Sequence, residues 1–194
     1  LAQVHASPAQ MDLRKLEWMN GEYIRRLPLE TFAEQFQAAL ASSGVLSEPP
    51  DPAYLRRVAA LMQVRTHTFG DVPALAAFFF RDDFPWDEKT ARKRLQKPGL
   101  PEKIQRFREI LAGLASFEAP AIEAALKAFA EKEGLPAADL IHAVRVAVSG
   151  LGVGPGLFEM LETLGRERVL TRLERALQRY ETDALEDRPN HAAS

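Results

Sequence analysis

Apolar residues recur at helical spacing along almost the whole chain. Phe32, Phe36 and Leu40 fall four residues apart and form one apolar stripe on a helix predicted from Pro28 to Ala41. No segment shows the alternation of apolar and polar residues that is typical of a half-buried strand. The pattern therefore predicts an all-α fold, a helical array of two small subdomains.

Proline and glycine divide this pattern into separate helices. Asp12 is a plausible N-cap for a short first helix, which Asn20-Gly21 is predicted to end. Three prolines between Glu48 and Pro52 exclude helix there, because proline lacks the amide donor and clashes with the preceding turn. Further helices are predicted over 73–80, 85–96, 120–132, 136–148 and 166–180, and from residues 54, 101 and 157 onward. On the helix from residue 101, the residues predicted to face inward are Ile104, Phe107, Ile110, Leu111 and Leu114.

The predicted helices suggest a division of the chain into four parts. Residues 1–27 are predicted to form a linker, 28–115 the first helical subdomain and 116–182 the second, with the subdomains meeting near 97–120. The polar, acidic end, 183–194, is predicted to be a mobile tail.

Composition narrows the possible functions. The 194 residues, 46% hydrophobic and 27% charged, are typical of a soluble globular protein. The absence of cysteine excludes disulfides, zinc-thiolate sites and cysteine nucleophiles, and it fits a reducing, cytoplasmic location. No apolar run has the length of a membrane span, and the first residues do not resemble a signal peptide. Because the chain begins with Leu1 rather than methionine, we expect it to be a fragment of a longer protein.

Candidate catalytic or metal-binding groups are not apparent. The histidines His5, His67, His142 and His191 show no ligand spacing with one another or with carboxylates. The glycine-rich segment 150–156 lacks the preceding strand and the following Lys-Ser/Thr of a phosphate-binding loop, so a tight connection between helices is favoured. The sequence thus predicts no catalytic residue, no metal site and no cofactor in this chain.

Basic residues cluster in two places, although the formal net charge of −2 does not by itself indicate a nucleic-acid binder. One cluster lies on the last helix, where four arginines recur at steps of four, three and four and so share one face. That face is either a solvated surface with intrahelical ion pairs or a surface that follows phosphates. The four arginines are Arg168, Arg172, Arg175 and Arg179. The other cluster comprises Lys89, Arg92, Lys93, Arg94, Lys97, Lys103, Arg106 and Arg108.

Four strings of the chain resemble those of one protein family. Asp12 to Arg25, preceded by Met11, resembles "FDLxKLxWMNGxYIR", which begins with phenylalanine and belongs to the C-terminal region of bacterial-type glutamyl-tRNA synthetases. Leu61 to Phe69 is similar to "LMxxRxxTL", Gly154 to Glu159 to "xPGLFE", and Leu164 to Leu173 to "LGKERxLxRL". The similarity runs in register from about Ala6 to Leu177, and the HIGH and KMSKS signatures of the class I catalytic domain are absent.

The resemblance implies that the chain is an anticodon-binding cage of helices, in which unstacked bases expose their Watson–Crick edges. Arg65 would contact the third anticodon letter, because its donors suit the acceptor-rich edge of a pyrimidine. A less favoured alternative is that Arg65 caps its own helix with Asp71, and for Leu157 the less favoured alternative is a core residue. The residues implied to line the pocket for the other letters are Arg145, Gly154, Pro155 and Leu157.

The resemblance also implies partners. Residues 1–27 would be the end that contacts the tRNA stem, with Trp18 as an anchor between subdomains and Asn20 as a helix C-terminal residue. The partners would be tRNA(Glu) and the catalytic domain of a parent glutamate-tRNA ligase, which would use ATP and Mg²⁺; neither DNA nor a membrane is expected. The alternative is a free-standing helical module of the same ancestry that binds tRNA or protein. The residues implied to touch the tRNA backbone are Lys15, Arg168, Arg172 and Arg175.

Overall fold

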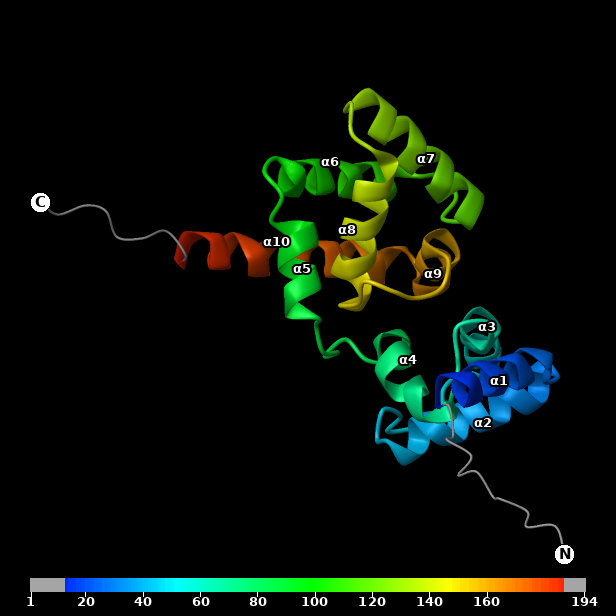
Figure 1. The fold of residues 1–194 in the computed structure, drawn as a ribbon. Coiled ribbons are helices and arrows are strands. Elements are labelled where there is room, and N and C mark those ends of the chain that lie inside the picture. The colour runs from blue at the N-terminus through cyan, green and yellow to red at the C-terminus, as the bar shows by residue number, and fades with distance from the viewer. Residues whose placement is uncertain (1–12, 187–194) are drawn as a thin grey trace, which may run out of the picture.

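The computed structural model describes residues 13–186, and within these residues every regular element is a helix (Figure 1). The elements are α1 (Leu13–Arg26), α2 (Leu29–Ser42), α3 (Pro52–Gln63), the 3₁₀ turn η1 (Phe69–Asp71), α4 (Val72–Phe80), α5 (Glu88–Leu95), α6 (Leu100–Gly113), α7 (Ala119–Lys132), α8 (Ala137–Ser149), α9 (Leu157–Leu164) and α10 (Arg166–Glu186). The predicted all-α fold is confirmed for this part of the chain.

Helices α1 to α4 form one group. Helix α2 packs on α3 and α4, and the stripe of Phe32, Phe36 and Leu40 that the sequence predicted is fully buried there. Asp51 begins α3 by accepting a hydrogen bond from the Tyr54 amide at 2.7 Å, and the prolines before it keep the preceding segment extended. Apolar burial on α2 therefore holds this group together.

Helices α5 to α10 form the second group, with α8 at its centre (Figure 1). Helix α8 packs against α5, α7 and α10, and seven of its thirteen residues are buried. Helix α10 also packs on α6 and α9. The two groups meet where α3 packs on α9 and α4 packs on α8.

The packing divides the chain earlier than the sequence predicted. Helices α5 and α6 were assigned to the subdomain 28–115, but they bury Leu95 and Phe107 in the group built around α8 and α10. The break in packing falls in the turn between Phe80 and Glu88, where Arg81 is extended. The reason is that the apolar faces of α5 and α6 complement α8 and α10, which follow much later in the chain.

The first helix differs from its prediction. Helix α1 continues through Asn20-Gly21 to Arg26, because Gly21 is buried against the His67 ring and Asn20 donates a hydrogen bond to the His67 carbonyl. A Cβ at Gly21 would lie 2.8 Å from His67 Nδ1, so the glycine provides room for the neighbouring segment rather than a helix end. Trp18 is 61% exposed and does not anchor the described helices to one another.

Two smaller expectations also differ. Ile110, predicted to face inward, is 38% exposed, whereas Ile104, Phe107 and Leu111 are fully buried as predicted. Helix α10 runs to Glu186 and so includes the first residues of the segment 183–194 that was predicted as a tail. The prediction for 187–194 lies outside the described residues, as does that for the stretch before residue 13.

Candidate functional site

Arg65 lies just beyond the end of α3, in the short connection to η1. Its amide donates to the Met62 carbonyl at 2.9 Å, and the buried Thr66 hydroxyl donates to the same carbonyl at 2.9 Å. These bonds fix the backbone while the Arg65 side chain is exposed and forms no hydrogen bond or ion pair with the described residues. The alternative of a cap with Asp71 is not seen, because that carboxylate accepts from the Thr68 amide and hydroxyl.

Arg145 comes from the middle of α8 and is half-buried. Its Nη1 donates to the Pro155 carbonyl at 2.6 Å, so the guanidinium is held against the loop that follows the helix. Burial and, second, the nearby positive charge of Arg65 hold the pKa of the Arg145 guanidinium below its ordinary value. The structure therefore places Arg65 near enough for its charge to act on Arg145, 80 positions later in the sequence.

The loop after α8 supplies the backbone of the site. Gly150 ends the helix in the left-handed conformation, at φ +73°, which glycine adopts without strain. A Cβ on Gly154 would lie 3.2 Å from Arg145 Nη1, so glycine lets the loop approach the guanidinium closely. Gly154, Pro155 and Arg145 thus form one cluster next to Arg65.

Leu157 has a different role from the one implied. It is 4% exposed and belongs to the core as the first residue of α9, so its side chain offers no surface to an unstacked base. This burial agrees with the alternative that it is a core residue. The exposed apolar side chains nearest in the sequence to the site are Val64 and Val153, at 59% and 69% exposure. Sequence reasoning missed both, although Val153 stands between two loop glycines that cannot cover it.

Arg172 is a correction to the predicted phosphate surface. It is 3% exposed, and its guanidinium donates to the carbonyls of Phe78 at 2.7 Å, Val148 at 2.8 Å and Arg81 at 2.9 Å. It also pairs with Asp82 at 2.7 Å. With its donors used inside the protein, Arg172 cannot reach a phosphate, nor does it lie on a solvated face.

The other arginines of this helix are divided. Arg168 Nη1 donates to the Phe79 carbonyl at 2.9 Å and its Nε lies 3.5 Å from Asp82, so it too is held by α4 and the turn after it. Arg179 pairs with Glu88 and lies over the Trp86 ring. Arg175 is exposed beside a cleft of about 340 Å³, and on α1 Lys15 is exposed. Of the four residues implied to touch the tRNA backbone, therefore, only Arg175 and Lys15 are exposed.

Burial alone would raise the pKa of Asp82, but the hydrogen bond from Arg172 and the charges of Arg172, Arg168 and Arg175 together lower it. Asp82 is therefore the anion that balances Arg172, Arg168 and Arg175 of α10. No carboxylate plays this part for Arg65 or Arg145 among the described residues. The pair thus presents positive charge and hydrogen-bond donors next to loop carbonyls and exposed valines, an arrangement suited to an acceptor-rich, planar or anionic ligand.

Within residues 13–186 there is no cluster of three or more His, Cys, Asp or Glu side chains placed to hold a metal ion. In the same residues, no helix is both long and apolar enough to cross a membrane.

The described residues thus form an all-helical module that carries a basic site lined by loop backbone. Residues 31–177 match the family described as the anticodon binding domain, and the chain belongs to this family.

Relatives of known sequence point to one group of proteins. The chain is 39% identical over 179 residues to the glutamate–tRNA ligase of Moorella thermoacetica, covering 91% of this chain and 36% of that protein. It is 42% identical over 167 residues to the glutamate–tRNA ligase of Thermus thermophilus, covering 86% and 35% respectively. The chain thus spans about a third of the length of these curated relatives.

A solved structure shows the same fold. The glutamate tRNA ligase from Elizabethkingia meningosepticum superposes with a TM-score of 0.74 at 24% identity, over 90% of this chain and 34% of that chain. The similarity to a solved structure extends over almost the whole described chain.

Proposed function

We propose that this chain is the tRNA-binding part of a glutamate–tRNA ligase and that it reads the anticodon of tRNA(Glu) at Arg65 and Arg145. The observation that carries the proposal is the convergence of Arg65, Arg145 and the Gly154-Pro155 backbone from segments far apart in the chain. The ligase relatives, of whose length the chain spans about a third, support the assignment to a parent enzyme of this kind.

The chemistry of the cluster suits a pyrimidine edge. Arginine carries five N–H donors in a planar fork and no acceptor, so it pairs with acceptor atoms of a base and repels a donor edge. The third anticodon letter is cytosine in glutamate tRNA and guanine in glutamine tRNA. Cytosine presents N3 and O2 acceptors to Arg65, whereas the Watson–Crick edge of guanine presents N1–H and an amine.

Arg145 serves the loop side of the same site. Its bond to the Pro155 carbonyl fixes the guanidinium plane, and its remaining donors are available for a second base. Val64 and Val153 supply apolar contact for bases that leave the stack, the part that Leu157 cannot play because it is buried. Single-stranded loops are recognised in this manner, by edges and faces of unstacked bases.

In this proposal the chemistry of aminoacylation belongs to the catalytic domain of the parent protein. ATP and Mg²⁺ are bound there, and the described residues of this chain bind and orient the anticodon arm. The cytoplasmic location predicted from the sequence is part of the same proposal.

A titration of the full 194-residue chain against a panel of purified tRNAs tests the proposal. We expect glutamate tRNA to bind more tightly than tRNAs with unrelated anticodons, because the base edges determine the contact with the two arginines. A glutamate tRNA transcript with an altered anticodon is the matched control, since its stem and backbone are unchanged. Equal affinity for all the tRNAs would contradict anticodon reading and leave only charge attraction.

A further inference from the structure

Helices α5 and α8 lie side by side and run in opposite directions (Figure 1). At one end the Asp87 amide, at the start of α5, donates to the Gly150 carbonyl at 2.9 Å. At the other end Lys97 Nζ, just after α5, bonds to Asp139 Oδ1 at 2.7 Å near the start of α8. The two helices are therefore joined at both ends, and their facing side chains form a continuous seam.

The α5 side of this seam is formed by Thr90 and Arg94, which lie four residues apart on one face of the helix. Lys97 follows two residues after the last residue of α5. Thr90 lies against the loop after α8, since a Cβ on Gly152 would be 2.8 Å from its Cγ2. The face of α5 that carries Thr90 and Arg94 therefore lies beside α8 and the loop after it.

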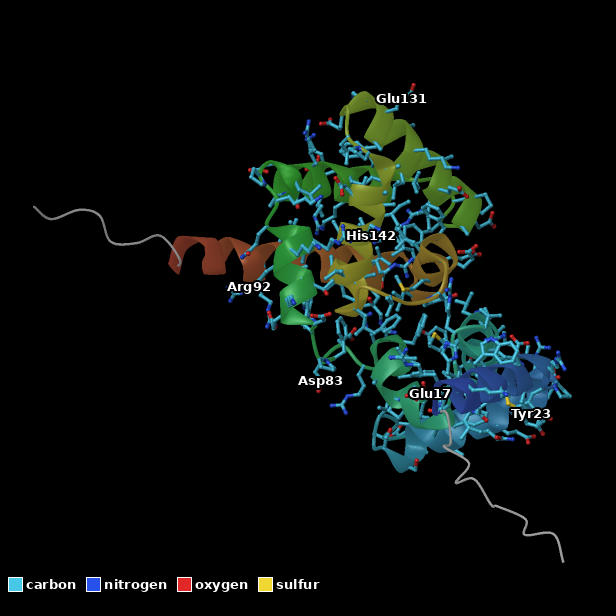
Figure 2. All side chains as sticks on the ribbon, in the orientation of Figure 1. Glu17, Tyr23, Asp83, Arg92, Glu131 and His142 are labelled. Carbon is cyan, nitrogen blue, oxygen red and sulfur yellow. The ribbon has the colours of Figure 1, made fainter. Side chains whose placement is uncertain are left out.

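The α8 side carries Asp139, His142 and Arg145, three residues apart and again on one face. Figure 2 labels His142 midway along this helix. Burial lowers the pKa of His142, and the positive charges of Arg94, Arg145 and Lys97 lower it further. The negative charge of Asp139 raises it, but by less. The cations of both helices thus lie close enough to act on one imidazole.

The balance of charge along the seam is unusual for this chain, whose formal net charge is −2. Three cations, Lys97, Arg94 and Arg145, act on His142, and the one carboxylate that acts on the same imidazole, Asp139, is already bonded to Lys97. Arg94 is half-buried and forms no hydrogen bond or ion pair with the described residues. Clustering like charges costs stability, so an anion that binds here would relieve a repulsion that the fold leaves uncompensated.

We propose that the α5–α8 strip, defined as Lys97, Arg94, His142 and Arg145, binds consecutive phosphates of the RNA strand whose bases are read at Arg65. This proposal rests on the proposed function and adds the path of the backbone. The strip continues into the Arg65–Arg145 pair, which ties it to the strand that carries the anticodon. From Asp139 to Arg145 the helix rises roughly 9 Å, at about 1.5 Å per residue. Phosphates of an unstacked strand lie further apart than the ~3.4 Å rise of a stacked strand, so this length accommodates about two of them.

The strip replaces the surface that the sequence placed on α10. Arg172 and Arg168 are occupied by carbonyls and Asp82, whereas Arg94 has no such partner. A phosphate contact carries no base information, so the strip is predicted to set affinity and the Arg65 site to set selectivity.

The test measures binding of the full chain to an anticodon-arm hairpin over a series of salt concentrations, with Arg94→Gln against Arg92→Gln. Arg92 is the matched control, because it lies two residues away on another face of α5 (Figure 2) and loses the same charge. We expect Arg94→Gln to weaken binding about threefold to tenfold at low salt and to reduce the salt slope by about 0.7 to 1. The same factor should apply to hairpins with a changed anticodon, and Arg94→Lys should restore the slope.

The outcomes separate this proposal from the proposed function. Equal affinities and slopes for Arg94→Gln and Arg92→Gln, with both variants showing the parent's unfolding temperature, would overturn the strip. A loss in Arg94→Gln that depends on the anticodon letter would also overturn it, since phosphates carry no such information. A reduced salt slope in Arg94→Gln would support the strip. If Arg65→Gln at the same time kept the parent's preference for the anticodon letter, the proposed reading site would be removed. A chain that binds no hairpin at low salt would contradict both.

Discussion

Arg172 on α10 and Arg65 after α3 carry the same guanidinium group in opposite surroundings, one buried and one exposed. Arg172 is 3% exposed, donates to three carbonyls, pairs with Asp82 and lies over the Phe84 ring, 4.7 Å from its centroid. Arg65 is exposed, and its positive charge acts on another cation, Arg145. Arg172 thus holds helices together, whereas the Arg65 side chain has no hydrogen bond or ion pair with the described residues.

The difference teaches that the spacing of cations on a helix does not reveal their function. A guanidinium enters a protein interior only when its donors are satisfied, and the C-terminal carbonyls of α4 and α8 satisfy those of Arg172. The regular stripe of arginines on α10 thus follows from the carbonyls and carboxylates it meets. Partners, rather than periodicity, distinguish a structural arginine from a binding one.

The largest expected effect is on stability, from Arg172→Met. The variant leaves the carbonyls of Phe78 and Val148 without a donor and Asp82 without its main partner. We expect the free energy of unfolding to fall by about 3–5 kcal/mol, because two carbonyls each lose a hydrogen bond from a charged donor, worth about 1.5–3 kcal/mol, while Asp82 is half exposed and can be solvated. Urea unfolding measures this, with Arg175→Met as the exposed control, expected to change stability by less than about 0.5 kcal/mol. Equal losses for the two variants would break the comparison between buried and exposed arginines.

Gly150→Ala should be next in size. A Cβ there would lie 2.6 Å from the Pro85 carbonyl, and the backbone is left-handed at φ +73°. Gly134→Ala is the matched control, because Gly134 also has positive φ, +60°, but no atom lies within 4 Å of its Cβ position. We expect about 1–2 kcal/mol of strain in both and about 1–3 kcal/mol more in Gly150→Ala. Thermal unfolding of the pair gives the difference, and a difference near zero would mean that the turn at 81–87 does not press on the end of α8.

Gly154→Ala should change binding rather than stability. Its Cβ would lie 3.2 Å from Arg145 Nη1, so the guanidinium must shift from its place against Pro155. We expect hairpin affinity to fall about threefold to tenfold, as for a weakened charge-assisted hydrogen bond, with unfolding free energy within about 0.5 kcal/mol of the parent. Fluorescence titration and urea unfolding on the same sample give both numbers. A stability loss without a binding loss would place Gly154 among the structural residues.

The smallest expected effect is a dependence of stability on pH through His142. Its pKa in the folded chain lies below 6.5, because burial and the charges of Arg94, Arg145 and Lys97 outweigh Asp139. The unfolded chain therefore takes up the proton first, and the free energy of unfolding should decrease as pH falls through 6.5 toward the lower folded value. His142→Gln should flatten this part of the stability–pH curve. A parent curve that already matches His142→Gln between pH 7 and 5.5 would show that the cations of the strip do not act on this imidazole.

Much of the fold could be predicted from local pattern. The stripe of Phe32, Phe36 and Leu40, the proline-rich break before α3 and the glycine stop at Gly150 are all short-range signals, and the structure confirms them. Gly21 was misread as a helix end because its role is set by His67, 46 residues later. Such long-range reasons for a residue are not visible in its neighbours.

The candidate site could be predicted only in part for the same reason. Arg65 and Arg145 are too far apart in sequence for spacing to join them, and the resemblance to the synthetase family supplied both. Burial of Leu157 and Arg172 depends on which elements cover α9 and α10, so the surface roles implied for them are wrong. Arg94 attracted notice only as one of a basic cluster, since its position beside α8 needs the packing of α5.

The central claim is that Arg65 reads a base, and one comparison tests it most directly. The parent chain and Arg65→Gln are each titrated with two anticodon hairpins that differ only in the third letter, cytosine or guanine. The account predicts that the parent prefers cytosine by about tenfold to a hundredfold, as for a bidentate contact of about 1–3 kcal/mol. Arg65→Gln should lose most of this preference while keeping the parent's stability, because an amide presents either a donor or an acceptor and the side chain is exposed. A preference that is the same in both proteins would contradict the account and remove Arg65 from the recognition site.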